Sequence, residues 1–185
     1  MKKILVLTLT MLFVMGMAVS AFAAQTISVK GVGSADKNYL TCFAGSITYT
    51  DGASKIQSTL STDGVLNLAY TFHKGGWIGA VSDSFMEDWS NFSGLTVNLA
   101  GGTNAKIRLE LSDANGVSYE VILLDDSKTG KVVTVPFSDF KKRTDWQPAG
   151  VDRSKAFSLK PVVSLNIAPL EGQGTITFSD MKLYK

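Results

Sequence analysis

Residues 107–124 read IRLELSDANGVSYEVILL, and this stretch predicts a β-hairpin. Apolar and polar residues alternate from Ile107 to Leu111 and again from Val117 onward, which is the period of a strand with one buried face. The segment Asp113–Gly116 between the two halves ends in an Asn-Gly step, which favours a tight turn. We therefore expect two antiparallel strands that bury the same side.

The same rhythm of short strands extends along the chain on both sides of this hairpin. Several short strands with turn residues between them, and no βαβ pattern, predict an all-β sandwich or barrel. Helical periodicity is confined to a turn or two at Ser84–Trp89. The further strands are expected at Leu66–Phe72, Leu95–Leu99, Val132–Val135, Val162–Ile167, Thr175–Phe178 and Met181–Tyr184.

A second informative stretch, VVTVPFSDFKKRTDW, runs from Val132 to Trp146. Pro136 lacks a backbone N–H and therefore suits the end of a strand. Phe137 and Phe140 lie three residues apart, so a single helical turn would direct both rings to the core. The chain then carries a large aromatic residue, Trp146, on a polar loop.

The first residues have the form of a secretory signal peptide. Lys2 and Lys3 precede an apolar run, and Ala21-Phe22-Ala23 provides a small-x-small cleavage signal. We expect cleavage after Ala23, which makes residues 1–23 the signal and residues 24–185 a single β-sandwich binding domain. The domain is expected in the periplasm or outside the cell, with no membrane insertion after cleavage, because no later segment is apolar for long enough.

The charge of the expected domain favours neither nucleic acid nor an anionic membrane as a partner. The chain holds 18 Lys+Arg and 16 Asp+Glu, and the signal contributes two lysines and no acid, so the domain balance is 18 − 2 = 16 against 16. A balance of zero gives no reason to expect nucleic acid or an anionic membrane surface as a partner. The single cysteine, Cys42, forms no internal disulfide and is expected to be a small hydrophobic residue between Leu40 and Phe43.

Taken in order, a series of segments resembles the carbohydrate-binding modules of the family 11 and family 30 type. It also resembles the related domain of the complex I intermediate-associated protein 30, and both groups are galactose-binding-domain-like jelly rolls. The ordered set is specific for the fold rather than for a ligand. The segments that carry the resemblance are Leu66-x-Leu68-x-Tyr70, Asp88-Trp89-Ser90-x-Phe92-x-Gly94-Leu95, Leu109-x-Leu111-Ser112-Asp113-x-Asn115-Gly116-x-x-Tyr119, Val135-Pro136-Phe137-Ser138-Asp139-Phe140 and Gly174-x-Ile176-x-Phe178-Ser179-Asp180-Met181-x-Leu183-Tyr184.

The resemblance implies a jelly-roll β-sandwich of two antiparallel sheets, one of them concave, with glucan-like chains bound across the concavity. It also implies a structural calcium ion near the chain termini, with Asp180 as the matching aspartate. The sequence departs from the family pattern at Ser179, where a second aspartate is common, and it lacks the acidic opening of many relatives. Because calcium takes six to eight oxygen ligands, the alternative for Asp180 is a turn residue at a strand end.

Sugar recognition needs flat apolar surfaces for pyranose rings and polar groups for hydroxyls. Trp77 lies in a glycine-rich loop and Trp146 lies among polar residues, so both are candidate platforms for ligand binding. Trp89, in the Asp-Trp-Ser step, is expected to pack under a sheet instead.

Polar candidates for ligand binding alternate with the core residues of the hairpin. Arg108, Glu110, Ser118 and Glu120 point away from the core, and they would meet on the concave face if these strands form it. His73 is a further candidate because it continues the polar side of its strand. The simpler alternative is a solvated sheet face with cross-strand charge pairs.

The sequence shows no catalytic motif, although counting acids does not exclude a glycosidase, which needs only two carboxylates. One histidine and one cysteine exclude a metal cluster of His and Cys ligands, and no nucleophile-elbow glycines surround a serine. The leading hypothesis is a non-catalytic secreted or periplasmic module that binds a glucan-like polysaccharide or oligosaccharide. The alternative is a protein-interaction or assembly domain of the cell envelope, which would fill the concave face with apolar side chains and bury Trp77.

Overall fold

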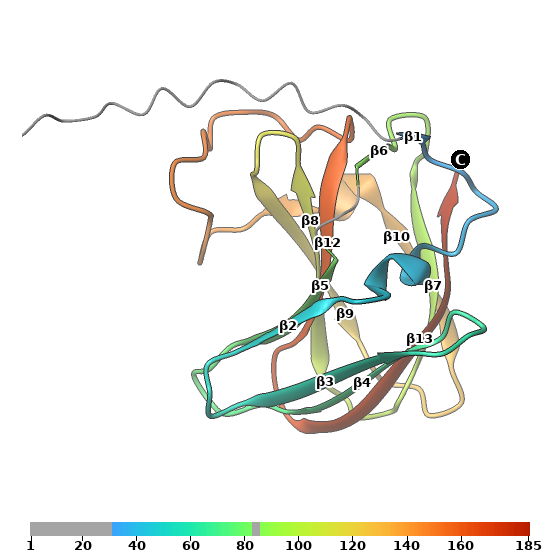
Figure 1. Cartoon of the computed structure of the whole chain (residues 1–185), viewed down its shortest axis with the longest axis vertical. Coiled ribbons are helices and arrows are strands. Elements are labelled where there is room, and N and C mark those ends of the chain that lie inside the picture. Colours follow the sequence, from blue (N-terminus) through green and yellow to red (C-terminus); the bar gives the residue numbers. More distant parts are fainter. Residues whose placement is uncertain (1–30, 83–85) are drawn as a thin grey trace, which may run out of the picture.

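The computed structural model describes residues 31–82 and 86–185, which form two facing β-sheets (Figure 1). The predicted signal peptide lies outside the described residues. Within the described part of the chain, no helix is long and apolar enough to cross a bilayer. The architecture is the all-β sandwich that the sequence predicts.

The larger sheet has eight strands, and all its neighbouring pairs are antiparallel except β1 and β6. In Figure 1, β2 and β5 run across the direction of β8 and β12, so the sheet twists strongly from one end to the other. Its main path is β1 (Gly31–Val32), β6 (Glu87–Asp88), β12 (Val162–Pro169), β8 (Lys106–Asp113), β9 (Ser118–Leu124) and β11 (Lys141–Lys142), while β5 (Ile78–Ser82) pairs with β12 and β2 (Ile47–Thr50) pairs with β5.

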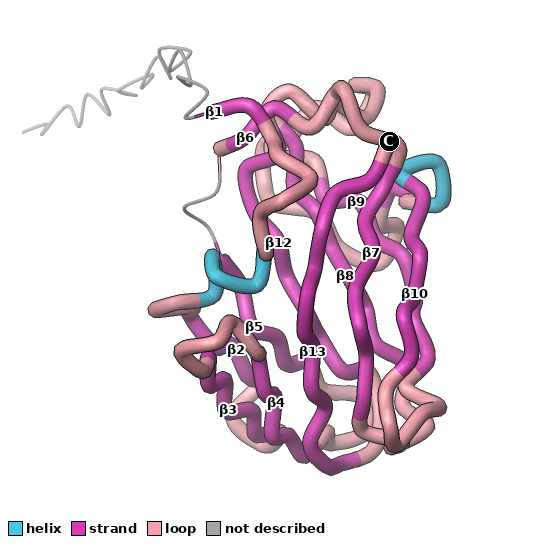
Figure 2. The backbone as a smooth tube through the Cα atoms, turned by 90° about the vertical axis from the view of Figure 1, so that its right-hand side faces the viewer, coloured by secondary structure: helices cyan, strands magenta, loops and turns pink. Residues whose placement is uncertain are grey.

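The smaller sheet has five antiparallel strands, and Figure 2 shows three of them, β13, β7 and β10, side by side. Two short 3-10 helices lie outside the sheets: η1 (Tyr39–Phe43) and η2 (Phe137–Asp139). The strand order of the smaller sheet is β10 (Lys131–Pro136), β7 (Gly94–Ala100), β13 (Gln173–Tyr184), β4 (Leu66–Thr71) and β3 (Lys55–Leu60).

The core lies between the two sheets and is built by alternation along each strand. In β8, Ile107, Leu109 and Leu111 are fully buried, and they face the interior because successive side chains of a strand point to opposite sides. Trp89 packs edge-on against Tyr39 at 5.0 Å between ring centroids and stacks on Phe137 at 5.7 Å. The prediction that Trp89 packs under a sheet is therefore confirmed.

The predicted hairpin is β8–β9. Its turn is closed by the Gly116 N–H, which donates to the Asp113 carbonyl oxygen at 2.9 Å, and Gly116 has a φ of +73°. The turn after β10 is confirmed as well, since η2 begins at Phe137 and both Phe137 and Phe140 are buried.

Two local predictions are wrong. The described part of Ser84–Trp89 contains strand β6 rather than a helical turn, because Glu87 and Asp88 pair with β1 and β12. The two expected C-terminal strands are one continuous strand, β13, with a bulge between Ser179 and Lys182. Sheet pairing outweighs weak local preference in both places.

Candidate functional site

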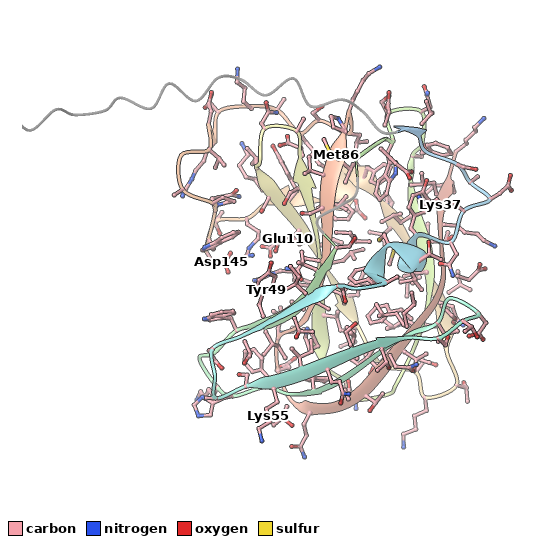
Figure 3. The ribbon with its side chains drawn as sticks, viewed as in Figure 1. Lys37, Tyr49, Lys55, Met86, Glu110 and Asp145 are labelled. Atoms are coloured by element: carbon pink, nitrogen blue, oxygen red, sulfur yellow. The ribbon has the colours of Figure 1, made fainter. Side chains whose placement is uncertain are left out.

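The larger sheet presents a surface of polar and apolar side chains on the side away from the core, which we call the outer face. A row of side chains crosses it from β2 to β11, because residues paired in register point to the same side. Figure 3 shows Tyr49, Glu110 and Asp145 on this side of the molecule. The row, defined by the strand register, is Ile47, Val81, Asn166, Glu110, Glu120 and Lys141.

Two carboxylates stand directly opposite each other in this row. Glu110 pairs with Glu120 across the β8–β9 hairpin, and like charges in that position destabilise a sheet. Two arginines compensate. Arg143 Nη1 lies 2.7 Å from Glu110 Oε2, and Arg108 Nε lies 2.5 Å from Glu120 Oε2, although this second contact is an ion pair without the alignment of a hydrogen bond.

Asp145 joins the two arginines. Its Oδ1 and Oδ2 accept from Arg143 Nε and Nη2 at 3.0 and 2.9 Å, which is a two-point contact, and Oδ2 also accepts from Arg108 Nη2 at 3.1 Å. The Arg143 hydrogen bonds lower the pKa of Asp145 to about 2, while the pKa of Arg143 is raised by Asp145 and Glu110 against the effect of its burial. The five charged groups of this cluster are two arginines and three carboxylates, which leaves one negative charge in excess.

The same arginine positions a tryptophan. The Arg143 guanidinium lies 5.1 Å from the ring centroid of Trp146, within the range of a cation–π contact. Trp146 is 51% exposed, so its ring stays accessible although it is held in place. The prediction of an accessible Trp146 on a polar loop is confirmed.

The segment Arg143–Gln147 covers part of the predicted polar face. Gln147 accepts from the Ser118 N–H at 2.9 Å and donates to the Ser118 carbonyl oxygen at 2.8 Å. Ser118 is consequently 1% exposed and Glu110 is 5% exposed, so neither forms an open surface. Arg108, Glu110, Ser118 and Glu120 do point away from the core, as predicted. The prediction that Glu110 and Ser118 are open to ligand is wrong, because this loop lies over them. Arg108 and Glu120 remain partly exposed.

At the other end of the sheet, Tyr49 and Trp77 form a second aromatic area. Tyr49 pairs with Gly79 between β2 and β5, and the Asp51 N–H extends this ladder to the Trp77 carbonyl oxygen at 3.1 Å. Tyr49 and Trp77 are therefore diagonal neighbours on the outer face. They are 42% and 57% exposed, so this area is open.

His73 lies away from the outer face. Strand β4 ends at Thr71 and belongs to the smaller sheet, and His73 follows it in a turn closed by the Gly76 N–H and the His73 carbonyl oxygen at 2.8 Å. The alternation of burial continues past the end of β4, since Thr71 and His73 are exposed and Phe72 between them is half-buried. The prediction that His73 continues the polar side of its strand is confirmed, but this strand belongs to the smaller sheet and not to the outer face.

Asp180 lies at the bulge of β13. It has a φ of +55°, its carboxylate pairs with Lys182 Nζ at 2.7 Å, and the side chain is well exposed. Across residues 31–82 and 86–185, no group of three or more His, Cys, Asp or Glu side chains could hold a metal ion. A calcium ion needs more oxygen ligands than this one paired carboxylate. The described carboxylates around Asp180 therefore do not by themselves provide the ligands of a calcium site. The calcium prediction is tested by comparing the thermal unfolding of the chain in calcium with that in a chelator.

A hollow of about 510 Å³ lies on the opposite side of the molecule, on the smaller sheet. Tyr70 is the one aromatic residue in its lining, and it is 4% exposed. The lining thus offers no ring on which a sugar could stack. We place the candidate binding site on the outer face of the larger sheet for this reason.

The residues that sequence reasoning did not select are Tyr49, Arg143, Asp145 and Asn166. Arg143 and Asp145 were visible as charged neighbours of Trp146, but nothing local linked them to the hairpin. Tyr49 alternates with Thr48 and Thr50 before an Asp-Gly turn, which is a short strand signal. Their common place on one face depends on how the strands are paired.

Comparison with known proteins yields a family match. A family model described as "Carbohydrate binding domain (family 11)" matches residues 20–185. Endoglucanase H of Acetivibrio thermocellus is 25% identical over 129 residues, which are 64% of this chain and 14% of that protein. The chain therefore spans a small part of the length of this relative.

Two solved structures share the fold. The family 11 carbohydrate-binding module from Clostridium thermocellum in complex with a β-1,3-1,4-mixed-linked tetrasaccharide has a TM-score of 0.64 and 23% identity, covering 76% of this chain and 89% of that chain. The family 11 module of the cellulosomal cellulase Lic26A-Cel5E of the same organism has a TM-score of 0.62 and 22% identity, covering 75% and 86%. At these identities the likeness shows a common β-sandwich.

Proposed function

The chain belongs to family 11 of the carbohydrate-binding domains, and we propose that it binds a mixed-linked β-glucan on the outer face of the larger sheet without cleaving it. The observation that carries this proposal is one face with exposed aromatic rings at both ends, Tyr49 with Trp77 and Trp146, and a polar strip between them. The choice of glucan is supported by the similar module solved with a β-1,3-1,4-mixed-linked tetrasaccharide.

The chemistry of the face suits a neutral polysaccharide. Exposed rings can stack on the C–H surfaces of pyranose units, and charged planar groups can form directional hydrogen bonds with hydroxyls. Trp146, Arg143 and Asp145 hold one another, so this end of the face loses little conformational freedom when a ligand binds.

The state of two carboxylates on this face supports the proposal that the chain does not cleave its ligand. A glycosidase needs a general acid whose pKa is raised so that it carries a proton near neutral pH. Here the pKa of Asp145 is lowered to about 2 by its bonds to Arg143, which is the opposite direction. Glu110 is buried under Arg143 and has no room to reach a substrate. We therefore propose a binding module that acts beside catalytic proteins, in the periplasm or outside the cell.

The alternative interpretation, an assembly domain for an envelope protein, expects a buried Trp77. Trp77 is 57% exposed, and the outer face carries a charged cluster at its centre. Both observations favour the carbohydrate proposal.

Affinity electrophoresis tests the proposal directly. The folded chain should be retarded in gels that contain mixed-linked β-glucan, and Trp146→Ala and Tyr49→Ala should migrate faster there. Val132→Ala is the matched control, because Val132 is an exposed apolar residue of the smaller sheet. Xyloglucan, starch and a soluble cellulose derivative provide the comparison. Free migration of the folded chain in every gel would overturn the proposal.

A further inference from the structure

The backbone of Trp77 is held at both of its polar groups by a single residue, Asp51. Asp51 Oδ2 accepts from the Trp77 N–H at 3.2 Å, and the Asp51 N–H donates to the Trp77 carbonyl oxygen at 3.1 Å. Trp77 precedes β5, and Asp51 follows β2, so this clamp continues the pairing of the two strands beyond their ends.

The carboxylate of Asp51 is itself fixed in place. Its Oδ1 accepts from the backbone N–H groups of Ala53 and Ser54 at 3.0 and 2.6 Å, and its Oδ2 accepts from Ser54 Oγ at 3.2 Å. Ser54 is 1% exposed, and its Oγ accepts from the His73 N–H at 3.0 Å. The cluster thus joins the β2–β3 turn to the β4–β5 loop, which are the two connections between the sheets at this corner (Figure 1).

The residue before Trp77 leaves room for this carboxylate. A Cβ on Gly76 would lie 1.7 Å from Asp51 Oδ2 and 2.8 Å from Ser54 Oγ. Any larger residue at Gly76 would displace the side chain that holds Trp77. Gly75, next to it, has no neighbour within 4 Å of an added Cβ, so the restriction on space is specific to Gly76.

We propose that Asp51, with Ser54 and Gly76, is the positioning residue for the Trp77 platform and sets the orientation in which that ring meets a glucan chain. The inference rests on the proposed function for its ligand, but the clamp itself is a property of the chain. Asp51 does not touch the sugar in this account. It acts by removing the freedom of an exposed ring that would otherwise be ordered only when the ligand binds.

A double-mutant cycle tests the assignment with mixed-linked β-glucan as the probe. Asp51→Asn keeps the size of the side chain and an acceptor for the turn, but it can replace the acceptor that faces the Trp77 N–H with a donor. We expect Asp51→Asn to weaken binding about fivefold to tenfold in the native background. In a Trp77→Ala background it should weaken binding less than about twofold, because the ring is no longer there to be positioned. Equal losses in the two backgrounds would overturn the assignment.

A second readout needs no ligand. In a Trp146→Phe background the described tryptophans are Trp77 and the buried Trp89, so time-resolved fluorescence anisotropy reports the motion of Trp77. Asp51→Asn and Gly76→Ala should each add a fast depolarising component, and Gly31→Ala, where an added Cβ meets nothing within 4 Å, should not. Unchanged anisotropy in both clamp variants would contradict the proposal.

The two proposals fail in distinguishable ways. If the folded chain binds no glucan but the anisotropy changes as expected, the carbohydrate proposal is wrong and the clamp stands. If Trp146→Ala abolishes binding while Trp77→Ala binds as well as the native chain, the carbohydrate proposal stands and the role of Asp51 in it is wrong.

Discussion

Arg143 is the residue on which the charged end of the outer face depends. Its guanidinium touches Glu110, Asp145 and the ring of Trp146, and its side chain is 10% exposed. Guanidinium geometry allows this, because one planar group can make a two-point contact with a carboxylate and still pack against an aromatic face. Lysine offers a single point charge and could not keep all three contacts.

Arg143→Ala should lower the free energy of unfolding by about 3 kcal/mol, because it leaves the buried Glu110 opposite Glu120 without its counter-charge. Urea unfolding measures this. Lys141→Ala is the control, since Lys141 lies nearby, is exposed and contacts the Ser138 carbonyl oxygen. The double variant Arg143→Ala with Glu110→Gln should recover part of the loss. Equal small losses for Arg143→Ala and Lys141→Ala would contradict the assignment.

Cys42 is expected to react slowly in the folded chain. Its thiol donates to the Tyr39 carbonyl oxygen at 2.7 Å, and burial raises its pKa to about 11. The thiolate is the reactive form, so labelling by a soluble disulfide reagent at pH 8 should be slow in the native state and fast in denaturant. Labelling is followed by the absorbance of the released thiol. Rapid labelling of the native chain would contradict the burial of the Cys42 thiol.

At the scale of elements, two glycines in strands are surrounded by different kinds of atoms, backbone at Gly94 and a side chain at Gly79. A Cβ on Gly94 in β7 would lie 2.3 Å from the backbone oxygen of Val135 in β10, which cannot move without breaking the strand pair. A Cβ on Gly79 in β5 would meet the side-chain Oδ1 of Asn166 at 2.7 Å, on the outer face beside Tyr49. A side-chain end can turn away, whereas backbone cannot.

The contrast between these glycines gives a paired prediction. Gly94→Ala should lower the free energy of unfolding by about 3 kcal/mol, which urea unfolding measures as a lower midpoint. Gly79→Ala should keep most of the stability and instead weaken retention by mixed-linked β-glucan, because it disturbs Asn166 and Tyr49. Gly31→Ala controls for the added methyl. The explanation fails if the two variants lose stability equally.

At the scale of the whole molecule, several carboxylates are held below their ordinary pKa, and this sets the response to acid. The Ser90 hydroxyl and N–H, with Lys160, lower the pKa of Asp88 to about 2, and Arg143 does the same for Asp145. A folded-state pKa below the unfolded value of 3.8 means that the ionised form favours the fold. The stability is therefore fully present above the unfolded pKa and is lost as the pH falls toward the folded pKa.

We expect the free energy of unfolding to be level with respect to these groups above about pH 5 and to fall between about pH 5 and pH 2. Urea titrations at a series of pH values measure it. Asp88→Asn should flatten part of this decline. A decline of the same size in Asp88→Asn would show that Asp88 is not one of the groups responsible. Asp145 is half exposed, so its contribution is reduced by solvent screening.

Pattern in the sequence was sufficient for the hairpin, β4, β7, β10, β12 and the turn at Phe137. In β4, and along most of β7 and β10, burial alternates with a period of two, and Pro136 marks the end of β10 before the turn. Pattern was not sufficient for β2, whose four residues are all exposed, or for β5, where small residues are buried on both sides. Apolar and polar residues do not alternate in a strand whose two sides are equally exposed or equally buried.

The sequence by itself therefore determined the sandwich class, the core and the exposed placement of Trp77 and Trp146, since these depend on local periodicity and on loop composition. Only the tertiary structure decided which polar residues form the candidate site. Residues 49, 77, 110, 143 and 166 come from five separate segments. Strand register brings residues 49, 110 and 166 to one face, and contacts with Asp51 and Glu110 bring residues 77 and 143 there. The loop at Arg143–Gln147 then closes over Glu110 and Ser118, a contact between distant segments that no local pattern encodes.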